Sequence, residues 1–234
     1  MISVLLIDKI NFYMLLITVL LMNNYANNIT DNIVHTKMKL QQEIKIVTQL
    51  KPVATNDVVL FENFRSISEV DTILSSVVDI LKGIEAFNKI YGIQILGISS
   101  IIMLYITDTF NTIFYFVEYQ TLTLEIIFMK CYNSFILLIF GMLMVSPCFE
   151  TNKQFDEVIK VTCKFLIELP HGLEDPYSKL LKEKLVLLIK QLEFRKPYFS
   201  AAGFFEVNYG MFMYIFAGIT SFVVVYVQLQ IKFK

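Results

Sequence analysis

The last part of the chain decides the fold class. Residues 207–231 read VNYGMFMYIFAGITSFVVVYVQLQI and contain no charged side chain. A helix that crosses the roughly 30 Å of hydrocarbon in a bilayer needs about 20 such residues. A helix also satisfies its own backbone hydrogen bonds, and the run lacks the strict alternation of a lipid-facing barrel strand. Residues 207–231 therefore predict a membrane-spanning helix.

Three more runs have the same character. Residues 10–30 and 131–149 carry no charge, and residues 90–117 carry only Asp108. We therefore expect an all-α polytopic membrane protein with four transmembrane helices, at residues 1–30, 92–118, 131–149 and 207–231. No basic segment precedes the first run, which disfavours a cleaved signal peptide.

Composition points to the same class of protein. Of the 234 residues, 56% are hydrophobic and 18% are charged, against roughly 25% charged in a typical soluble domain. The formal net charge of −1 gives no bulk attraction for nucleic acid, so the expected surroundings are a lipid bilayer.

The distribution of positive charge predicts the orientation. Most Lys and Arg residues lie in segments 23–91 and 150–206, whereas the rest of the chain has only Lys9, Lys130, Lys232 and Lys234. Positive loops favour the cytoplasm, so both segments are expected inside and both termini outside. Residues 119–130 are then a short extracellular loop. The glycosylation acceptor Asn28-Ile29-Thr30 is expected to stay unmodified.

The two inner segments are themselves expected to be helical. Apolar residues recur at steps of three and four at Ile67, Val70, Leu74, Val77, Leu81, Ile84, Tyr91 and Ile95. This pattern predicts one long helix in the segment 31–91 that continues into the span 92–118. These apolar residues form a seam along one face of the predicted helix. Asn88 lies in this seam, either as an ordinary interfacial polar residue or as a contact that sets the register between helices.

Two amphipathic stripes follow in the segment 150–206. The stripes are Phe155, Val158, Thr162, Phe165 and Leu169, and then Leu181, Leu185, Leu188 and Leu192, with Lys182, Glu183, Lys184 and Lys190 largely on the wet side. Pro170-His171-Gly172 separates them, and Pro197 precedes the last span. We expect these helices to pack against each other or against other subunits, with a helix lying on lipid as the alternative.

Motifs for catalysis and metal binding are missing from the sequence. His35 and His171 have no ligand-like neighbours, and the three cysteines form no Cys-x-x-Cys pair. Gly92 and Gly97 have the spacing of phosphate-loop glycines without the lysine, and are expected to be helix-packing glycines. We predict no enzyme activity, no metal and no cofactor.

Asp108 is an acid inside a membrane run, where a carboxylate costs roughly 2.5–3.5 kcal/mol on insertion scales. Thr107, Thr109, Asn111 and Thr112 form a polar belt around it, and Asn133 and Ser134 on the next helix could face the same space. The belt indicates either a ligand or water cavity, formed by Asp108, Thr109, Asn111, Thr112 and Asn133, or a structural hydrogen bond between helices. Gln228 is a second polar point, and it either sits at the interface or lines a pore.

The C-terminal sequence resembles the signature of insect gustatory receptors. That signature is Thr-Tyr, five apolar residues and Gln-Phe; here Ser221, Phe222, Gln228 and Leu229 take those four places with the same spacing. The stretch Ala201-x-Gly-x-Phe-x-Val-Asn208 is a second match.

The resemblance implies a seven-span receptor, of which these four helices would correspond to spans four to seven, with the chain a C-terminal portion. It implies a tastant-gated cation channel in the plasma membrane of gustatory neurons, acting in taste perception and signal transduction. Subunits would form a homo- or hetero-tetramer, anchored by the cytoplasmic helices. Gln228 and Leu229 would lie at the pore constriction, with Ser221 and Phe222 earlier on the pore helix. The alternative is a four-helix membrane scaffold without a channel.

Overall fold

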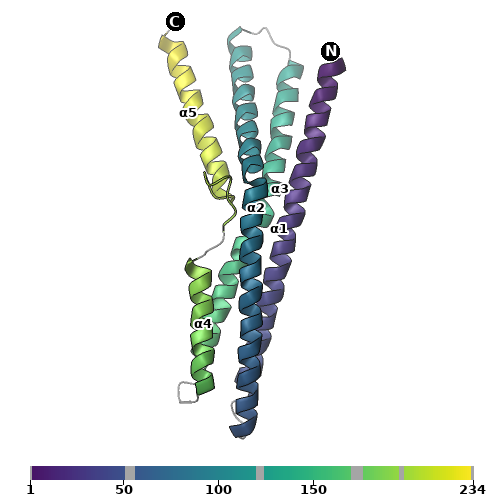
Figure 1. Cartoon of the computed structure of the whole chain (residues 1–234). Helices are drawn as coiled ribbons and strands as arrows, with labels where there is room; N and C mark the ends of the chain where they lie inside the picture. Colours follow the sequence, from purple (N-terminus) through teal and green to yellow (C-terminus); the bar gives the residue numbers. More distant parts are fainter. Residues whose placement is uncertain (1, 51–55, 120–123, 170–175, 195–197, 233–234) are drawn as a thin grey trace. The chain divides into compact units, whose positions relative to one another are not determined.

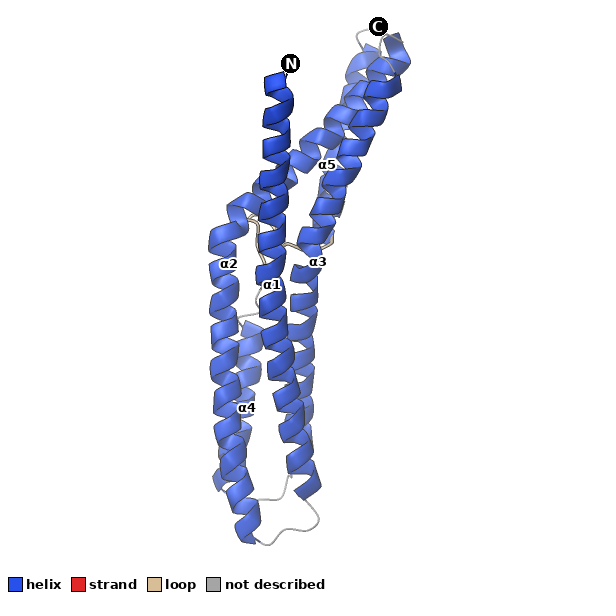
Figure 2. Ribbon diagram, turned by 90° about the vertical axis from the view of Figure 1, so that its right-hand side faces the viewer, coloured by secondary structure: helices blue, strands red, loops and turns tan. Residues whose placement is uncertain are grey.

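A computed structural model describes residues 2–50, 56–119, 124–169, 176–194 and 198–232. Five helices account for almost all of them: α1 (Ile2–Leu50), α2 (Asn56–Tyr119), α3 (Leu124–Glu168), α4 (Pro176–Phe194) and α5 (Gly210–Lys232) (Figure 1). Figure 2 shows no β-strand in these ranges. An isolated antiparallel β-bridge joins Ser200 and Glu206. The predicted all-α fold is confirmed.

Three helical stretches within the described residues are long and apolar enough to cross a membrane: Ile67–Val117, Leu124–Glu168 and Gly210–Leu229. They overlap the three later predicted spans, 92–118, 131–149 and 207–231. The first run, residues 10–30, is helical in α1 but is not among these stretches. The side chains of residues 2–11 lie outside the described part, so a fourth span there stays a prediction.

The helices belong to two compact units. Unit 1 consists of Met1–Tyr25, Phe87–Phe149 and Phe199–Lys234, and unit 2 of Ala26–Ala86 and Glu150–Tyr198. The unit boundaries fall after residues 25, 86, 149 and 198, whereas the predicted boundaries between spans and cytoplasmic segments fall after residues 30, 91, 149 and 206. The predicted spans and cytoplasmic segments stay predictions. Helices α1, α2 and α3 each contribute residues to both units, because each is far longer than a bilayer requires.

The surface of unit 1 is what a lipid-facing structure requires. Its helices expose large apolar side chains along their length, among them Ile93, Leu104, Val117, Phe128, Met213 and Tyr214. A continuous apolar surface of this kind would be an aggregation site in water, whereas lipid tails cover it at no cost. In unit 2, the large apolar side chains that are exposed are fewer: Met38, Ile167, Leu180, Leu187, Phe194 and Tyr198 among the described residues.

Unit 2 confirms the two amphipathic stripes. All nine predicted residues are buried, and Leu181, Leu185, Leu188 and Leu192 are fully so. The stripes therefore pack within one chain. Lys184 differs from the prediction, since its side chain is partly buried and pairs with Asp71 of α2. The breaks at Pro170-His171-Gly172 and Pro197 fall outside the described residues.

Helix α2 confirms most of the predicted seam and corrects two positions. Leu74 and Tyr91 are only half-buried, while Ile73, Ile80 and Phe87 are buried beside the seam. The reason is geometric. An α-helix drifts by about 20° per heptad against a strict seven-residue repeat, and α2 packs against more than one neighbour, so its buried face is wider than a two-residue stripe.

Two boundaries also differ from the expected ones. Helix α3 begins at Leu124, so the later part of the expected loop 119–130 is helical. Helix α5 begins at Gly210, and Val207 instead donates its backbone N–H to Phe199 O at 2.7 Å. A short hairpin therefore precedes the last helix.

Candidate functional site: the outward face of α5 and the polar cluster of α2 and α3

Helix α5 packs on α2 along one edge. Its buried residues Met211, Ile215 and Ile219 are spaced by four and so lie on one face of the helix. Three contacts join it to α2: Ser99 Oγ is 3.4 Å from Met211 Sδ, a Cβ on Gly218 would come within 2.9 Å of Met103 Cε, and the rings of Phe114 and Tyr226 are 6.0 Å apart. Residue numbers increase in the same direction on both helices through these three pairs, so the two helices run parallel within unit 1.

The predicted pore residues lie on two sides of α5. Ser221 and Gln228 are both exposed and are seven residues apart, which puts them about 20° apart around the helix. They lie on the side turned away from the buried edge. Phe222 and Leu229 are 41% and 51% exposed and are seven and fourteen residues after Ile215, so they continue the side of the helix that carries the buried edge. The four motif residues therefore lie on two sides of α5 about 100° apart, with the polar pair turned away from α2.

The hydroxyl groups of Ser221 and of its sequence neighbour Thr220 are satisfied within the helix itself. Ser221 Oγ donates to Ala217 O at 2.9 Å, and Thr220 Oγ1 donates to Phe216 O at 2.8 Å. Phe222 and Tyr226 stack with ring centroids 6.3 Å apart. The donors of Ser221 and Thr220 thus need no water or partner, and each hydroxyl can still accept a hydrogen bond.

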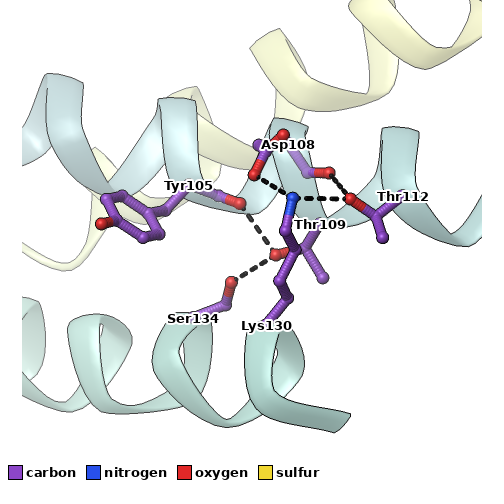
Figure 3. A network of polar contacts seen from close by, with 6 residues as sticks. All are labelled: Tyr105, Asp108, Thr109, Thr112, Lys130 and Ser134. Carbon is purple, nitrogen blue, oxygen red and sulfur yellow. Dashed lines mark hydrogen bonds and ion pairs between the residues drawn. The ribbon is translucent and has the colours of Figure 1, made fainter. Parts of the chain in front are cut away.

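Figure 3 shows the second candidate region, a polar cluster that joins α2 to α3. Lys130 Nζ donates to Asp108 Oδ2 at 2.6 Å and to Thr112 Oγ1 at 2.8 Å, and Thr112 Oγ1 donates to Asp108 O at 2.9 Å. The ammonium group of Lys130 neutralises the carboxylate of Asp108. The cost of placing Asp108 in an apolar helix is thereby reduced.

A second bond between the helices lies beside the first, one turn further along α3. Thr109 Oγ1 is 2.7 Å from Ser134 Oγ and donates to Tyr105 O at 2.8 Å. Since the single hydroxyl proton of Thr109 goes to Tyr105, the hydroxyl of Ser134 is the donor between the two side chains. Thr109, Thr112 and Ser134 are buried. The cluster consists of positions 105, 108, 109 and 112 on one face of α2 and positions 130 and 134 on one face of α3.

The cluster includes only some of the predicted cavity residues. Asp108, Thr109 and Thr112 belong to it, whereas Asn111 is half-buried and Asn133 exposed, and neither takes part in the network. The hydrogen bond between helices, one of the two readings of the belt, is present. A role in ligand binding stays a prediction.

Lys130 is the residue that sequence reasoning missed, because it was counted only as a loop charge. No periodic pattern in the sequence marks it, because its role depends on Asp108, which it faces across the helical hairpin.

A search of curated proteins found no match to this chain. The sequence model of a family described as "7tm Chemosensory receptor" matches residues 2–233. This match agrees with the resemblance of the C-terminal motif to insect gustatory receptors and with the apolar helices of unit 1. The chain therefore belongs to the 7tm chemosensory receptor family.

Proposed function

We propose that this chemoreceptor is a subunit of a tastant-gated cation channel and that α5 lines its pore. The observation that carries the proposal is the placement of Ser221 and Gln228 on one exposed line of α5, opposite its edge against α2. A polar line on an otherwise apolar helix is costly against lipid, where an amide finds no partner. It becomes favourable when several copies of the helix surround water.

A ring of Gln228 side chains would serve a cation conduit well. Each amide presents a carbonyl oxygen, whose dipole can replace part of the hydration shell of a cation without binding it as tightly as a carboxylate would. Val224 and Val225, one turn earlier, and Leu229, the next residue, are exposed and apolar. Apolar side chains next to the ring allow the pore to close by dewetting.

The assembly that this requires is a homo- or hetero-tetramer with other receptor subunits in the plasma membrane of gustatory neurons. Family membership supports a receptor for small molecules, and the α2–α3 polar cluster is a candidate part of the region that responds to the tastant. Asp108, Thr109, Asn111, Thr112 and Asn133 are the residues to mutate first. The exposed carboxylate of Asp108 and its ammonium partner Lys130 offer both an acceptor and a donor to a hydroxylated ligand.

Cysteine accessibility tests the pore face with a matched control. Ser221→Cys and Thr220→Cys replace adjacent hydroxyl residues that make the same bond to their own helix, but Thr220 points about 80° away from Gln228 around α5. The chain is expressed in cultured cells, and currents are recorded during application of a tastant panel. A charged thiol reagent is expected to block tastant-evoked current in Ser221→Cys and Gln228→Cys, and to leave Thr220→Cys conducting.

Block of Thr220→Cys to the same extent, or no block of any of the three, would exclude α5 as the pore lining in this orientation. Surface-expressed protein that never supports tastant-dependent current would favour the alternative, a membrane scaffold. In the same recordings, Gln228→Ala is expected to change ion selectivity, since it removes the carbonyl ring while keeping the helix.

A further inference from the structure

A short hairpin at residues 199–207 leads into α5. Val207 donates its N–H to Phe199 O at 2.7 Å, and Ala201 donates to Phe205 O at 3.0 Å, around the bridge between Ser200 and Glu206. The turn closes with Phe204 N–H donating to Ala201 O at 3.0 Å. Its two central residues, Ala202 and Gly203, have φ of 52° and 82°, the positive values of a type I′ turn.

The hairpin docks on one and a half turns of α2. The rings of Phe87 and Phe199 meet edge to face with centroids 4.8 Å apart, and Asn88 Oδ1 accepts the backbone N–H of Ser200 at 2.8 Å. Phe87, Phe199, Ser200 and Ala201 are buried. Asn88 therefore binds the backbone of the hairpin. It accepts a hydrogen bond from the Ser200 N–H, which does not take part in the backbone bonds across the hairpin given above.

Gly92 makes this close approach possible. A Cβ at Gly92 would lie 2.8 Å from Ala202 N and 3.2 Å from Ser200 O, which are backbone atoms that cannot rotate away. Gly92 is thus a packing glycine, but it packs against a hairpin and not against a helix as predicted. Gly97, on the same helix, would have no atom within 4 Å of its Cβ, so the same prediction for Gly97 is wrong within this chain.

Helix α5 starts three residues after the hairpin, and its first buried side chain already touches α2. Met211, the second residue of α5, is 1% exposed and contacts Ser99. Backbone bonds from Met211 N to Asn208 O and from Phe212 N to Tyr209 O continue the chain of contacts from the hairpin into the first helical turn. The position of that turn therefore depends on where the hairpin docks.

We propose that Asn88 and Gly92 are positioning residues that fix the first turn of α5 on α2 through the hairpin 199–207. The consequence for gating rests on the proposed function. Because the first turn of α5 is held on α2, the pore opens when the Gln228 end of α5 swings outward, and α5 does not slide along α2. The residues that hold the first turn then set how readily the tastant opens the channel, although they touch neither tastant nor ion.

Glycine substitutions provide a matched pair for the test. Gly92→Ala forces the hairpin off α2, whereas Gly97→Ala places the same methyl group in open space on the same helix. Single reporter cysteines at Ala201 and Met211, both buried, are introduced after the native Cys131, Cys148 and Cys163 are replaced. Maleimide labelling of the whole chain in detergent then measures how often each site opens.

The expected result is labelling of both reporters about tenfold faster or more in Gly92→Ala than in Gly97→Ala. Equal rates at the Ala201 reporter in the two variants would overturn the docking. A faster rate at the Ala201 reporter with an unchanged rate at the Met211 reporter would overturn the positioning of α5. Neither outcome depends on any current, so both decide the inference even if the channel proposal fails.

The gating consequence is tested with Asn88. Asn88→Asp keeps an oxygen that accepts the Ser200 N–H, and Asn88→Leu removes it at similar volume. We expect Asn88→Leu to shift the half-maximal tastant concentration by about fivefold or more, with unchanged single-channel conductance, and Asn88→Asp to stay near wild type. An unchanged half-maximal concentration in Asn88→Leu would overturn the inference. A wild-type chain without any current would instead contradict the proposed function.

Discussion

At the scale of single residues, the pair of Asp108 and Lys130 shows how a membrane protein tolerates a charge. Lys130→Met is expected to leave the Asp108 carboxylate without its ammonium partner in an apolar helix, at a cost on the order of 2–3 kcal/mol. The thermal midpoint of the purified protein in detergent measures the loss. The charge swap Asp108→Lys with Lys130→Asp is expected to recover most of it, because the pair is re-formed. If the loss of stability in the swapped double variant equals the sum of the losses in the two single variants, the two residues do not couple.

The same pair shows what a single sequence reveals at this scale. Asp108 was predictable because a carboxylate within an apolar run is rare and needs a reason. Lys130 was not, because its importance depends on the residue that it faces, and pairing between helices leaves no periodic signal. Asn133 is exposed and lies outside the network, because its place beside Ser134 in the sequence puts it about 100° away around α3, and its role in ligand binding stays a prediction.

At the scale of elements, hydrophobic periodicity was sufficient for the stripes of α3 and α4. Each stripe repeats at three and four residues and so forms one face of its helix, and every predicted position is buried. The longer α2 seam was predicted less well at Leu74 and Tyr91, because a helix with several neighbours buries a broad face that no single heptad describes. The hairpin 199–207 was not predicted, since its turn uses Ala202 at positive φ, where Asn or Gly is the usual signal.

Helix α4 offers a sharp test of its buried stripe. Leu185→Ala removes a fully buried side chain and is expected to destabilise the chain by about 2–4 kcal/mol through the cavity that it leaves. Leu187→Ala, two residues on and 47% exposed, is the control and is expected to cost less than about 1 kcal/mol. Both are measured as shifts of the thermal unfolding midpoint. Equal shifts would contradict the packing of α4 described here.

The contact between α1 and α3 in unit 2 predicts a dependence on pH. Lys37 Nζ lies 2.6 Å from both Glu157 Oε2 and Gln154 Oε1, and the hydrogen bond and charge of Lys37 lower the pKa of Glu157 from its ordinary value of 4.5. A lowered folded-state pKa means that the ionised form stabilises the fold. This stabilisation is present above pH 4.5 and is lost as the pH falls through the lowered pKa.

Lys37→Met should therefore have a lower thermal midpoint than wild type at pH 7, and the difference should shrink as the pH is taken below 4.5. Because Glu157 is exposed, added salt should reduce the difference as well. Lys39→Met, an exposed lysine two residues further on α1, serves as the control. A difference between wild type and Lys37→Met that is the same at pH 7 and pH 3 would assign the effect of Lys37 to Gln154 alone.

At the scale of the whole molecule, the division of the chain into two units was predictable because two solvents impose it. Residues that must face lipid tails are apolar on all sides, and residues that face water are apolar on one side only, so hydropathy separates the two before any contact is known. The contact-based boundaries differ from the predicted ones by up to eight residues, and they coincide at Phe149, where one segment of unit 1 and a charge-free run both end. The register between neighbouring helices was not predictable, because helix faces that are buried against other helices differ little in composition from faces that are exposed to lipid.

The acceptor Asn28-Ile29-Thr30 makes the predicted orientation testable. Positive charge in segments 31–91 and 150–206 places this site on the cytoplasmic side, where no glycan is added. The local structure also opposes modification: the acceptor is helical, and Thr30 Oγ1 donates to Ala26 O at 3.0 Å while it lies 2.7 Å from Thr151 Oγ1. An acceptor tripeptide added after Lys234 should instead reach the lumen and receive a glycan.

Gel mobility before and after glycosidase treatment is the measurement for these acceptors. The C-terminal acceptor is expected to give a glycosidase-sensitive shift, and Asn28→Gln is expected to leave the mobility of the natural chain unchanged. A shift that Asn28→Gln abolishes would place segment 31–91 outside and reverse the orientation. Because α5 ends on the same side as the added acceptor, that reversal would also turn the Gln228 end of the proposed pore toward the cytoplasm, where an external thiol reagent could reach it only through the conduit itself.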